Sequence, residues 1–121
     1  MTRLTNITVL GTGVLGSQIA FQTAFSGFDV VAWDVDDAAL EAAEVRFRTL
    51  ADRYIREDFQ GSAGGKADAA LGRLRFTTDL AEAAKDADLV IEAVPEQLDL
   101  KRGIYERLGA VAPAKTIFAT N

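Results

Sequence analysis

The fold is decided by the stretch Ile7-Thr8-Val9-Leu10-Gly11-Thr12-Gly13-Val14-Leu15-Gly16, in which a short apolar strand leads directly into Gly-x-Gly-x-x-Gly. In a dinucleotide-binding turn the first glycine, Gly11, permits a tight bend, Gly13 leaves room for a pyrophosphate, and Gly16 lets the next helix lie close to the sheet. The free N–H groups and the positive dipole end of that helix favour the negative charge of a diphosphate. These residues therefore predict a nucleotide site at the end of the first strand.

An acidic residue follows the second apolar strand at the distance that such a site requires. Asp34 comes after the strand Asp29 to Trp33 and lies about 20 residues beyond the glycines, where a carboxylate binds ribose hydroxyls. A lone glycine motif could be only a tight turn, but here the strands, the glycines, the helix and the acid coincide. Asp34, Asp36 and Asp37 would repel a 2′-phosphate, and no Arg follows directly to offset them. We therefore predict NAD as the cofactor in preference to NADP. We also prefer NAD to FAD, because nothing beyond the shared glycines indicates a flavin site.

Composition argues against several classes of function. The chain has 121 residues, which suits a single domain, residues 1–121, on a prior of roughly 100–200 residues per domain. Its formal net charge of -5 argues against nucleic acid and anionic membranes as partners. It has no cysteine or histidine, which excludes disulfides, thiol nucleophiles and the usual zinc sites and removes the commonest general base. No apolar run approaches the roughly 18 residues of a membrane span and no signal-peptide pattern follows Met1, so we expect a cytoplasmic protein.

Strands and helices alternate along the chain, which predicts an α/β fold with a doubly wound parallel sheet of the Rossmann type. We expect strands near 6–10, 29–33, 74–77, 88–94 and 115–119, in the usual spatial order 3-2-1-4-5. We expect helices near 14–26, 37–58, 79–85 and 97–111. Asp79, followed three residues later by Glu82, predicts a capping box at the third of these helices.

The segment 37–72 departs from this simple alternation. A long helix is predicted from apolar residues at heptad-like spacing, namely Leu40, Ala43, Phe47, Leu50 and Tyr54. A break at Gly61-Ser62-Ala63-Gly64-Gly65 separates it from a short helical stretch through Leu71. We therefore expect a helical arm inserted after the second strand and projecting beyond the sheet. Two interpretations stay open: an insertion that only packs against its neighbour, or an arm that handles substrate.

The segment Ala93-Val94-Pro95-Glu96-Gln97-Leu98-Asp99-Leu100-Lys101-Arg102 resembles the 3-hydroxyacyl-CoA dehydrogenases, including the 3-hydroxybutyryl-CoA dehydrogenases. The resemblance runs from Ile7 to Asn121 and includes the glycine motif, Trp33-Asp34, the helical arm and the closing Thr116-Ile117-Phe118-Ala119-Thr120-Asn121. It implies reversible hydride transfer, within fatty acid metabolism, between NAD and the 3-hydroxy carbon of an acyl-CoA.

The resemblance also implies a role for particular residues. Ala93 and Val94 match the backbone that borders the cofactor after the fourth strand. Glu96 and Lys101 match polar residues near the nicotinamide half, and Asn121 matches the asparagine beside the nicotinamide ribose. The predicted cofactor-binding residues are therefore Gly11, Gly13, Val14, Leu15, Gly16, Asp34, Ala93, Val94, Glu96, Lys101 and Asn121.

Simpler interpretations exist for some of these charged residues. Glu96 could be an acid that the helix dipole favours, and Lys101 could be a solvated helix lysine. Arg53 and Arg56 on the long helix are tempting partners for CoA phosphates. They do not match the arm residues of the family, and a charged helix face usually meets water, so they are left out of the predicted site.

The resemblance ends before the catalytic machinery of the family. Its catalytic histidine and the glutamate that orients it lie beyond Asn121, and this chain has no histidine. We therefore expect a truncated cofactor-binding half that binds NAD without turnover, the acyl-CoA substrate belonging to the complete enzyme. We also expect a homo-oligomer, because the last strand would leave an exposed apolar edge.

Two other interpretations stay open. One is an autonomous nucleotide-sensing module with a regulatory role, like those attached to potassium channels. The other is a two-domain dehydrogenase that acts on a phosphorylated sugar or glycerol. The helical arm argues against both, and Pro95-Glu96 argues against the sensing module.

Overall fold

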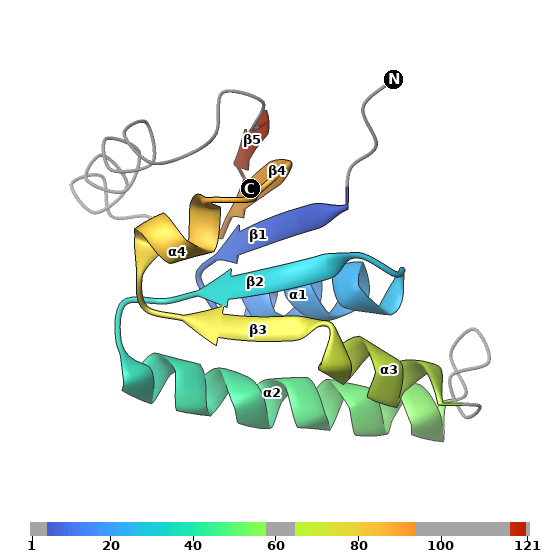
Figure 1. Ribbon diagram of the computed structural model, residues 1–121. Helices are drawn as coiled ribbons and strands as arrows, with labels where there is room; N and C mark the ends of the chain where they lie inside the picture. Colours follow the sequence, from blue (N-terminus) through green and yellow to red (C-terminus); the bar gives the residue numbers. More distant parts are fainter. Residues whose placement is uncertain (1–4, 58–64, 94–116, 121) are drawn as a thin grey trace.

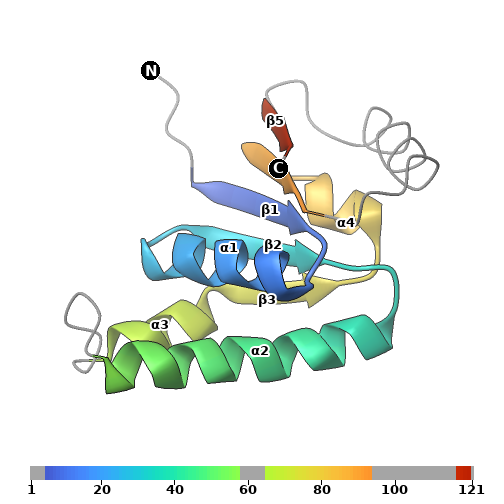
Figure 2. The same ribbon diagram turned by 180° about the vertical axis from the view of Figure 1, so that it is seen from behind.

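The computed structural model describes residues 5–57, 65–93 and 117–120. Its strands form one parallel sheet in the order β3-β2-β1-β4-β5, with the bounds β1 (Asn6–Leu10), β2 (Asp29–Trp33), β3 (Leu74–Thr77), β4 (Leu89–Glu92) and β5 (Ile117–Thr120). The helices of the described residues are α1 (Val14–Phe25), α2 (Asp37–Arg56), α3 (Lys66–Gly72) and α4 (Leu80–Ala84). Helices α1 and α4 lie on opposite faces of the sheet (Figures 1 and 2), so the predicted doubly wound Rossmann fold and its strand order are confirmed.

The predicted elements differ from the observed ones mainly at their ends. Strand β4 is shorter than the predicted 88–94, and β5 starts two residues later than predicted. Helices α1 and α2 each end one or two residues earlier than predicted, which is the usual fraying of a helix end. The predicted helix 97–111 lies outside the described residues. None of the described helices is long and apolar enough to cross a membrane.

Helix α1 covers one face of the sheet with a large apolar core. Alternate strand residues point to it, as the period of two in a strand requires, and they meet small and aromatic residues of the helix. The buried members from the strands and α1 are Ile7, Val9, Val30, Ala32, Leu74, Ala20, Phe21, Ala24 and Phe25. Gly27, with φ +107°, ends this helix in the left-handed conformation that favours glycine.

The helical arm after β2 is present, but it is less separate than predicted. Helices α2 and α3 lie beyond the β3 edge of the sheet (Figure 1), yet one face of α2 belongs to the core. Ala43, Phe47 and Ala51 are fully buried, and the Phe47 ring lies 5.6 Å from the ring of Phe76 on β3. Tyr54 packs edge-on against Phe21 of α1, with ring centroids 4.9 Å apart. The apolar stripe of α2 therefore holds the arm against α1.

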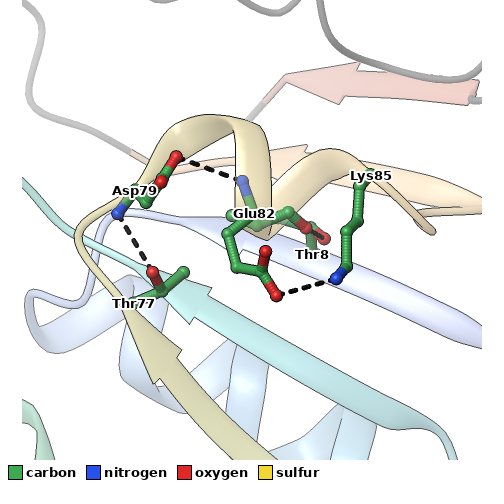
Figure 3. Close-up of polar contacts among 6 residues, drawn as sticks. Thr8, Thr77, Asp79, Glu82 and Lys85 are labelled. Atoms are coloured by element: carbon green, nitrogen blue, oxygen red, sulfur yellow. Dashed lines mark hydrogen bonds and ion pairs between the residues drawn. The ribbon is translucent and has the colours of Figure 1, made fainter.

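The short helix α4 covers part of the opposite face. Its Leu80, Ala83 and Ala84 pack with Trp33 and Leu10, which point away from α1. Asp79 caps this helix by accepting a hydrogen bond from the backbone N–H of Glu82 at 3.2 Å, as predicted (Figure 3).

The second half of the predicted capping box is not formed. The N–H of Asp79 donates to the hydroxyl of Thr77 at 3.0 Å, while the Glu82 carboxylate pairs with Lys85 at 3.0 Å (Figure 3). In a reciprocal box the Glu82 carboxylate would accept from the N–H of Asp79. Here the Thr77 hydroxyl accepts from that N–H, and Lys85 pairs with the carboxylate.

Candidate nucleotide-binding site

The glycine turn has the geometry that its sequence predicts. Gly11 has φ +99°, a conformation that favours glycine, and its N–H donates to the carbonyl of Trp33 at 2.8 Å. A Cβ atom at Gly16 would lie 2.0 Å from the carbonyl oxygen of Gly11, so a side chain there would collide with the backbone. Among the residues that the structure describes, a Cβ atom at Gly13 would meet nothing within 4 Å. One glycine therefore permits close packing, and another leaves open space outside the turn.

The N-terminus of α1 faces this open space without a competing group from its own side chains. Gly13 is the N-cap, no side chain caps the helix, and its first turn contains no acidic residue. Val14 and Leu15 of that first turn are exposed, at 68% and 51% of their surfaces. The free N–H groups and the dipole of α1 are thus available to an anion.

Asp34 lies beside the turn. Its Oδ2 atom accepts hydrogen bonds from the N–H of Thr12 at 2.9 Å and from the Thr12 hydroxyl at 2.6 Å. Its Oδ1 atom accepts from the N–H of Val35 at 2.7 Å. The acid at the end of β2 and the turn after β1 therefore form a single cluster.

The carbonyl oxygen of Thr12 is also held, by two donors from different helices. The Ser17 hydroxyl of α1 donates to it at 2.8 Å, and Nη1 of Arg46 on α2 donates to it at 3.1 Å. Sequence reasoning missed Thr12, Ser17 and Arg46. The position of Thr12 is variable in the motif, and no local pattern links Arg46 to a turn 34 residues earlier.

The end of β4 reaches the same place. The N–H of Ala93 donates to the carbonyl of Leu10 at 2.8 Å, and the Ala93 Cβ atom lies 3.5 Å from where a side chain at Gly16 would begin. Glu92, buried to 2% exposure, is paired in register with Leu10. The structure thus brings together Gly11, Gly13, Val14, Leu15, Gly16, Asp34 and Ala93 of the predicted site. The remaining predicted residues lie outside the described ranges, namely Val94, Glu96, Lys101 and Asn121.

A groove of about 220 Å³ lies between α1 and α2, next to the glycine turn. Val14 and Ser17 line it from α1, and Arg46, Leu50 and Arg53 line it from α2. Arg53, which was left out of the predicted site, therefore faces a groove beside the turn. Among the residues that the structure describes, no cluster of acidic side chains could hold a metal ion.

Fold and turn together define a dinucleotide-binding domain of the Rossmann type. The family model of the 3-hydroxyacyl-CoA dehydrogenase NAD-binding domain matches residues 6–121, and the chain belongs to this family. The predicted family resemblance and the predicted cofactor, NAD, are therefore confirmed.

Curated relatives share this domain over part of their length. A probable 3-hydroxyacyl-CoA dehydrogenase from Caenorhabditis elegans is 30% identical over 100% of this chain and 40% of its own length. An L-carnitine dehydrogenase from Streptomyces griseus is 39% identical over 95% of this chain and 32% of its own length. The chain thus spans about a third to two-fifths of the relatives it matches.

Solved structures agree in fold. The structure of a diketoreductase, described as acting on dicarbonyl compounds, has 66% identity and a TM-score of 0.96 over 100% of this chain and 42% of its own. The (S)-3-hydroxybutyryl-CoA dehydrogenase from Ralstonia eutropha has 28% identity and a TM-score of 0.88 over 98% of this chain and 41% of its own. The similarity therefore extends across the whole domain.

Proposed function

We propose that this chain is the cofactor-binding portion of a longer oxidoreductase, in which Asp34 binds the adenosine ribose of NAD and the N-terminus of α1 binds the pyrophosphate. The observation that carries this proposal is the pair of hydrogen bonds, 2.9 and 2.6 Å, by which Thr12 of the glycine turn joins Asp34. These bonds place the acid beside the helix N-terminus that would hold the phosphates. The share of each relative that the chain covers supports its being a portion of a longer protein.

The residues present fit a dinucleotide. The space outside Gly13 would be partly filled by any side chain there, and the uncapped first turn of α1 offers N–H groups to a diphosphate. The carboxylate of Asp34 suits ribose hydroxyls and would repel a 2′-phosphate. When bound, NAD exchanges a hydride with a substrate carbon, and the residues of this domain hold and orient it.

The nicotinamide half of the site remains part of the proposal. We assign Glu96, Lys101 and Asn121 to it, and Val94 to the backbone that borders the cofactor after β4, because they match such residues in the family that the chain resembles. Ala93 supports this assignment, since it directly precedes these residues in the chain and its N–H donates to the carbonyl of Leu10 beside the glycine turn.

The substrate class has two candidates. The first is a 3-hydroxyacyl-CoA or its 3-oxo form, which agrees with the family and with relatives named 3-hydroxyacyl-CoA dehydrogenase. The second is a dicarbonyl compound without CoA, and it is favoured by the 66% identity to a diketoreductase, against 28% to a 3-hydroxybutyryl-CoA dehydrogenase. Both candidates use the same chemistry, in which a hydride moves between NAD and a carbon that carries a hydroxyl or an oxo group.

Calorimetric titration of the chain with NADH, and separately with NADPH, tests the cofactor site. Calorimetry is preferable to tryptophan fluorescence, because Trp33 is buried on the α4 side and its Nε1 donates to the carbonyl of Thr78. We expect NADH to bind more tightly than NADPH, and we expect Asp34→Ala to weaken NADH binding about tenfold. Gly13→Ala should also weaken NADH binding while the thermal midpoint stays close to that of the parent chain.

Asp29→Ala is the matched control, because Asp29 is an exposed acid at the opposite end of the same strand. It should leave the NADH affinity unchanged. If Asp34→Ala and Asp29→Ala had the same small effect, the assignment of Asp34 to the ribose would be wrong.

Turnover and substrate class need a second measurement. With no histidine in the chain, we expect no NADH oxidation when the 121-residue chain is mixed with acetoacetyl-CoA. The full-length protein should oxidise NADH, and the ratio of kcat/KM for acetoacetyl-CoA to that for an uncoupled diketo ester separates the two candidates. Saturable NADH binding with no turnover of either compound by the full-length protein would favour the sensing module instead.

A further inference from the structure

We propose that Thr12 is a positioning residue that sets the NAD-over-NADP selectivity of the site by fixing the carboxylate of Asp34. This inference rests on the proposed function, because it requires Asp34 to read the ribose. It adds a residue that the glycine motif leaves unspecified, since the second position of Gly-x-Gly accepts many side chains.

Every hydrogen-bonding group of Thr12 is engaged. Its N–H and its hydroxyl both donate to Oδ2 of Asp34, and its carbonyl accepts from Ser17 and Arg46. The residue is buried to 1% exposure, although Gly13 beside it is exposed. Thr12 is thus held from α1 and α2 while it holds Asp34 at the end of β2.

The contacts of Asp34 show which atom Thr12 leaves for a ligand. A carboxylate has about four acceptor positions, two on each oxygen. Among the described residues, Thr12 takes two positions on Oδ2 and the N–H of Val35 takes one on Oδ1. The remaining position is on Oδ1, so Thr12 turns the carboxylate to present this atom to a ribose hydroxyl.

A fixed carboxylate discriminates better than a mobile one. A carboxylate held by two donors cannot rotate away from a 2′-phosphate, so its negative charge opposes NADPH at full strength. Without the hydroxyl of Thr12, Asp34 keeps only the N–H on Oδ2 and gains freedom to turn aside. Loss of this hydroxyl should therefore weaken NADH binding and relieve the repulsion of NADPH together.

Thr12→Val tests the inference, because valine keeps the branched shape and the backbone N–H but has no hydroxyl. Calorimetric titration of the chain should show NADH binding weakened about fivefold and the NADH-to-NADPH affinity ratio reduced by a similar or larger factor. Thr12→Ser, which keeps the hydroxyl, should restore most of the ratio. Should Thr12→Val fail to fold, Thr12→Ala takes its place in the same titrations.

Ser17→Ala is the matched control for a purely structural role. This change removes the 2.8 Å hydrogen bond from the Ser17 hydroxyl to the carbonyl of Thr12, and it leaves both hydrogen bonds from Thr12 to Asp34 in place. Because the glycine turn serves both cofactors equally, Ser17→Ala should change the two affinities by the same factor and leave their ratio intact.

The outcomes separate this inference from the proposed function. A reduced ratio in Thr12→Val, but not in Thr12→Ser or Ser17→Ala, supports the positioning role. An unchanged ratio in Thr12→Val, with selectivity lost in Asp34→Ala, would overturn the role of Thr12 alone. If Asp34→Ala itself kept the affinity and the ratio of the parent chain, the proposed ribose site would fail as well.

Discussion

The two faces of the sheet differ in how deeply their helices are anchored. On the α1 face, three helices join the strands in a core that contains Phe21, Phe25 and Phe47. On the α4 face, the described residues supply a helix of five residues, LAEAA, over Trp33 and Leu10. A cavity of about 150 Å³, bordered by Arg75, Glu82 and other polar groups, remains beside it.

The larger core on the α1 face anchors helix α1 against the sheet. Helix α1 is held at its first turn by the Ser17 hydroxyl and near its end by Arg73, whose Nη1 donates to the carbonyl of Ala24 at 3.0 Å. Its N-terminus is also the proposed phosphate site. Among the described residues, the face that carries the proposed phosphate site is therefore the face with the larger core, and a well-anchored helix keeps the turn in place before a ligand arrives.

The largest expected effect comes from separating α1 from the sheet. Gly16→Ala would place a Cβ atom 2.0 Å from the carbonyl oxygen of Gly11, and backbone atoms have little room to move. We expect a loss of about 3 kcal/mol in the free energy of unfolding, the upper part of the range for overpacking. Urea denaturation followed by circular dichroism measures it. A stability equal to that of the parent chain would show that α1 is free to shift away from the turn.

Truncation of one buried residue on each face compares the two cores directly. Phe47→Ala should cost about 3–5 kcal/mol and Leu80→Ala less, at the lower part of about 2–5 kcal/mol, although both side chains are 1% exposed. Phe47 fills space between α2 and β3. Leu80 belongs to a short helix beside a cavity, and such a helix can shift to fill part of the space that the truncation leaves. Equal losses in urea titrations of the two variants would remove the distinction between the faces.

A smaller effect should appear at alkaline pH on the α1 face. Burial raises the pKa of Tyr54 above its ordinary value of 10.0, and its hydroxyl donates to Oε1 of Gln22 at 2.6 Å. The unfolded chain therefore releases this proton at a lower pH than the folded one, so stability should fall as pH rises through 10.0.

Tyr54→Phe provides the check on this pH dependence. Below pH 9 it should cost about 1 kcal/mol, the worth of a typical hydrogen bond, and it should flatten the alkaline loss. Thermal melts from pH 8 to 11 of both proteins measure this. A loss of the same steepness in both would assign it to other groups, such as lysines.

The smallest effect is expected on the surface of α4. Lys85 pairs with Glu82 at 3.0 Å, but both side chains are more than half exposed. Hydrogen bonding and attraction from the Glu82 carboxylate raise the pKa of Lys85, yet solvent screens such a pair and it contributes little to stability. Lys85→Ala should leave the thermal midpoint unchanged at low and high salt. A clear drop would mean that α4 depends on this ion pair more than on its buried alanines.

Much of the fold could be predicted because its signals are local. The apolar strand Ile7–Leu10, the glycines after it and Asp34 after the second strand each specify a conformation or a contact over a few residues. In the structure, Gly11 has a left-handed φ and Gly16 packs closely against the backbone of Gly11. Asp34 lies beside the glycine turn and accepts a hydrogen bond from Thr12. The helical arm was also predicted, because an apolar stripe at helical spacing extends along it.

The missed features depend on contacts between distant parts of the chain. Arg46 reaches the turn only because α2 packs beside α1, and no short pattern contains that information. The same packing converts the predicted projecting arm into a partly buried layer. At α4, the predicted hydrogen bond from the N–H of Asp79 to the Glu82 carboxylate is not formed, because Thr77 and Lys85 supply competing partners.

Residue patterns alone were enough to predict the class of fold, the strand order, and the glycine turn with its neighbouring acid, because glycine spacing, apolar runs and an acid at a set distance act through local backbone geometry. The cluster in which Thr12 joins Asp34, Ser17 and Arg46 could not be predicted in this way, because it depends on how distant segments pack. The reason is physical: a hydrogen bond needs donor and acceptor within about 3 Å, and packing of α1, α2 and the sheet sets that distance.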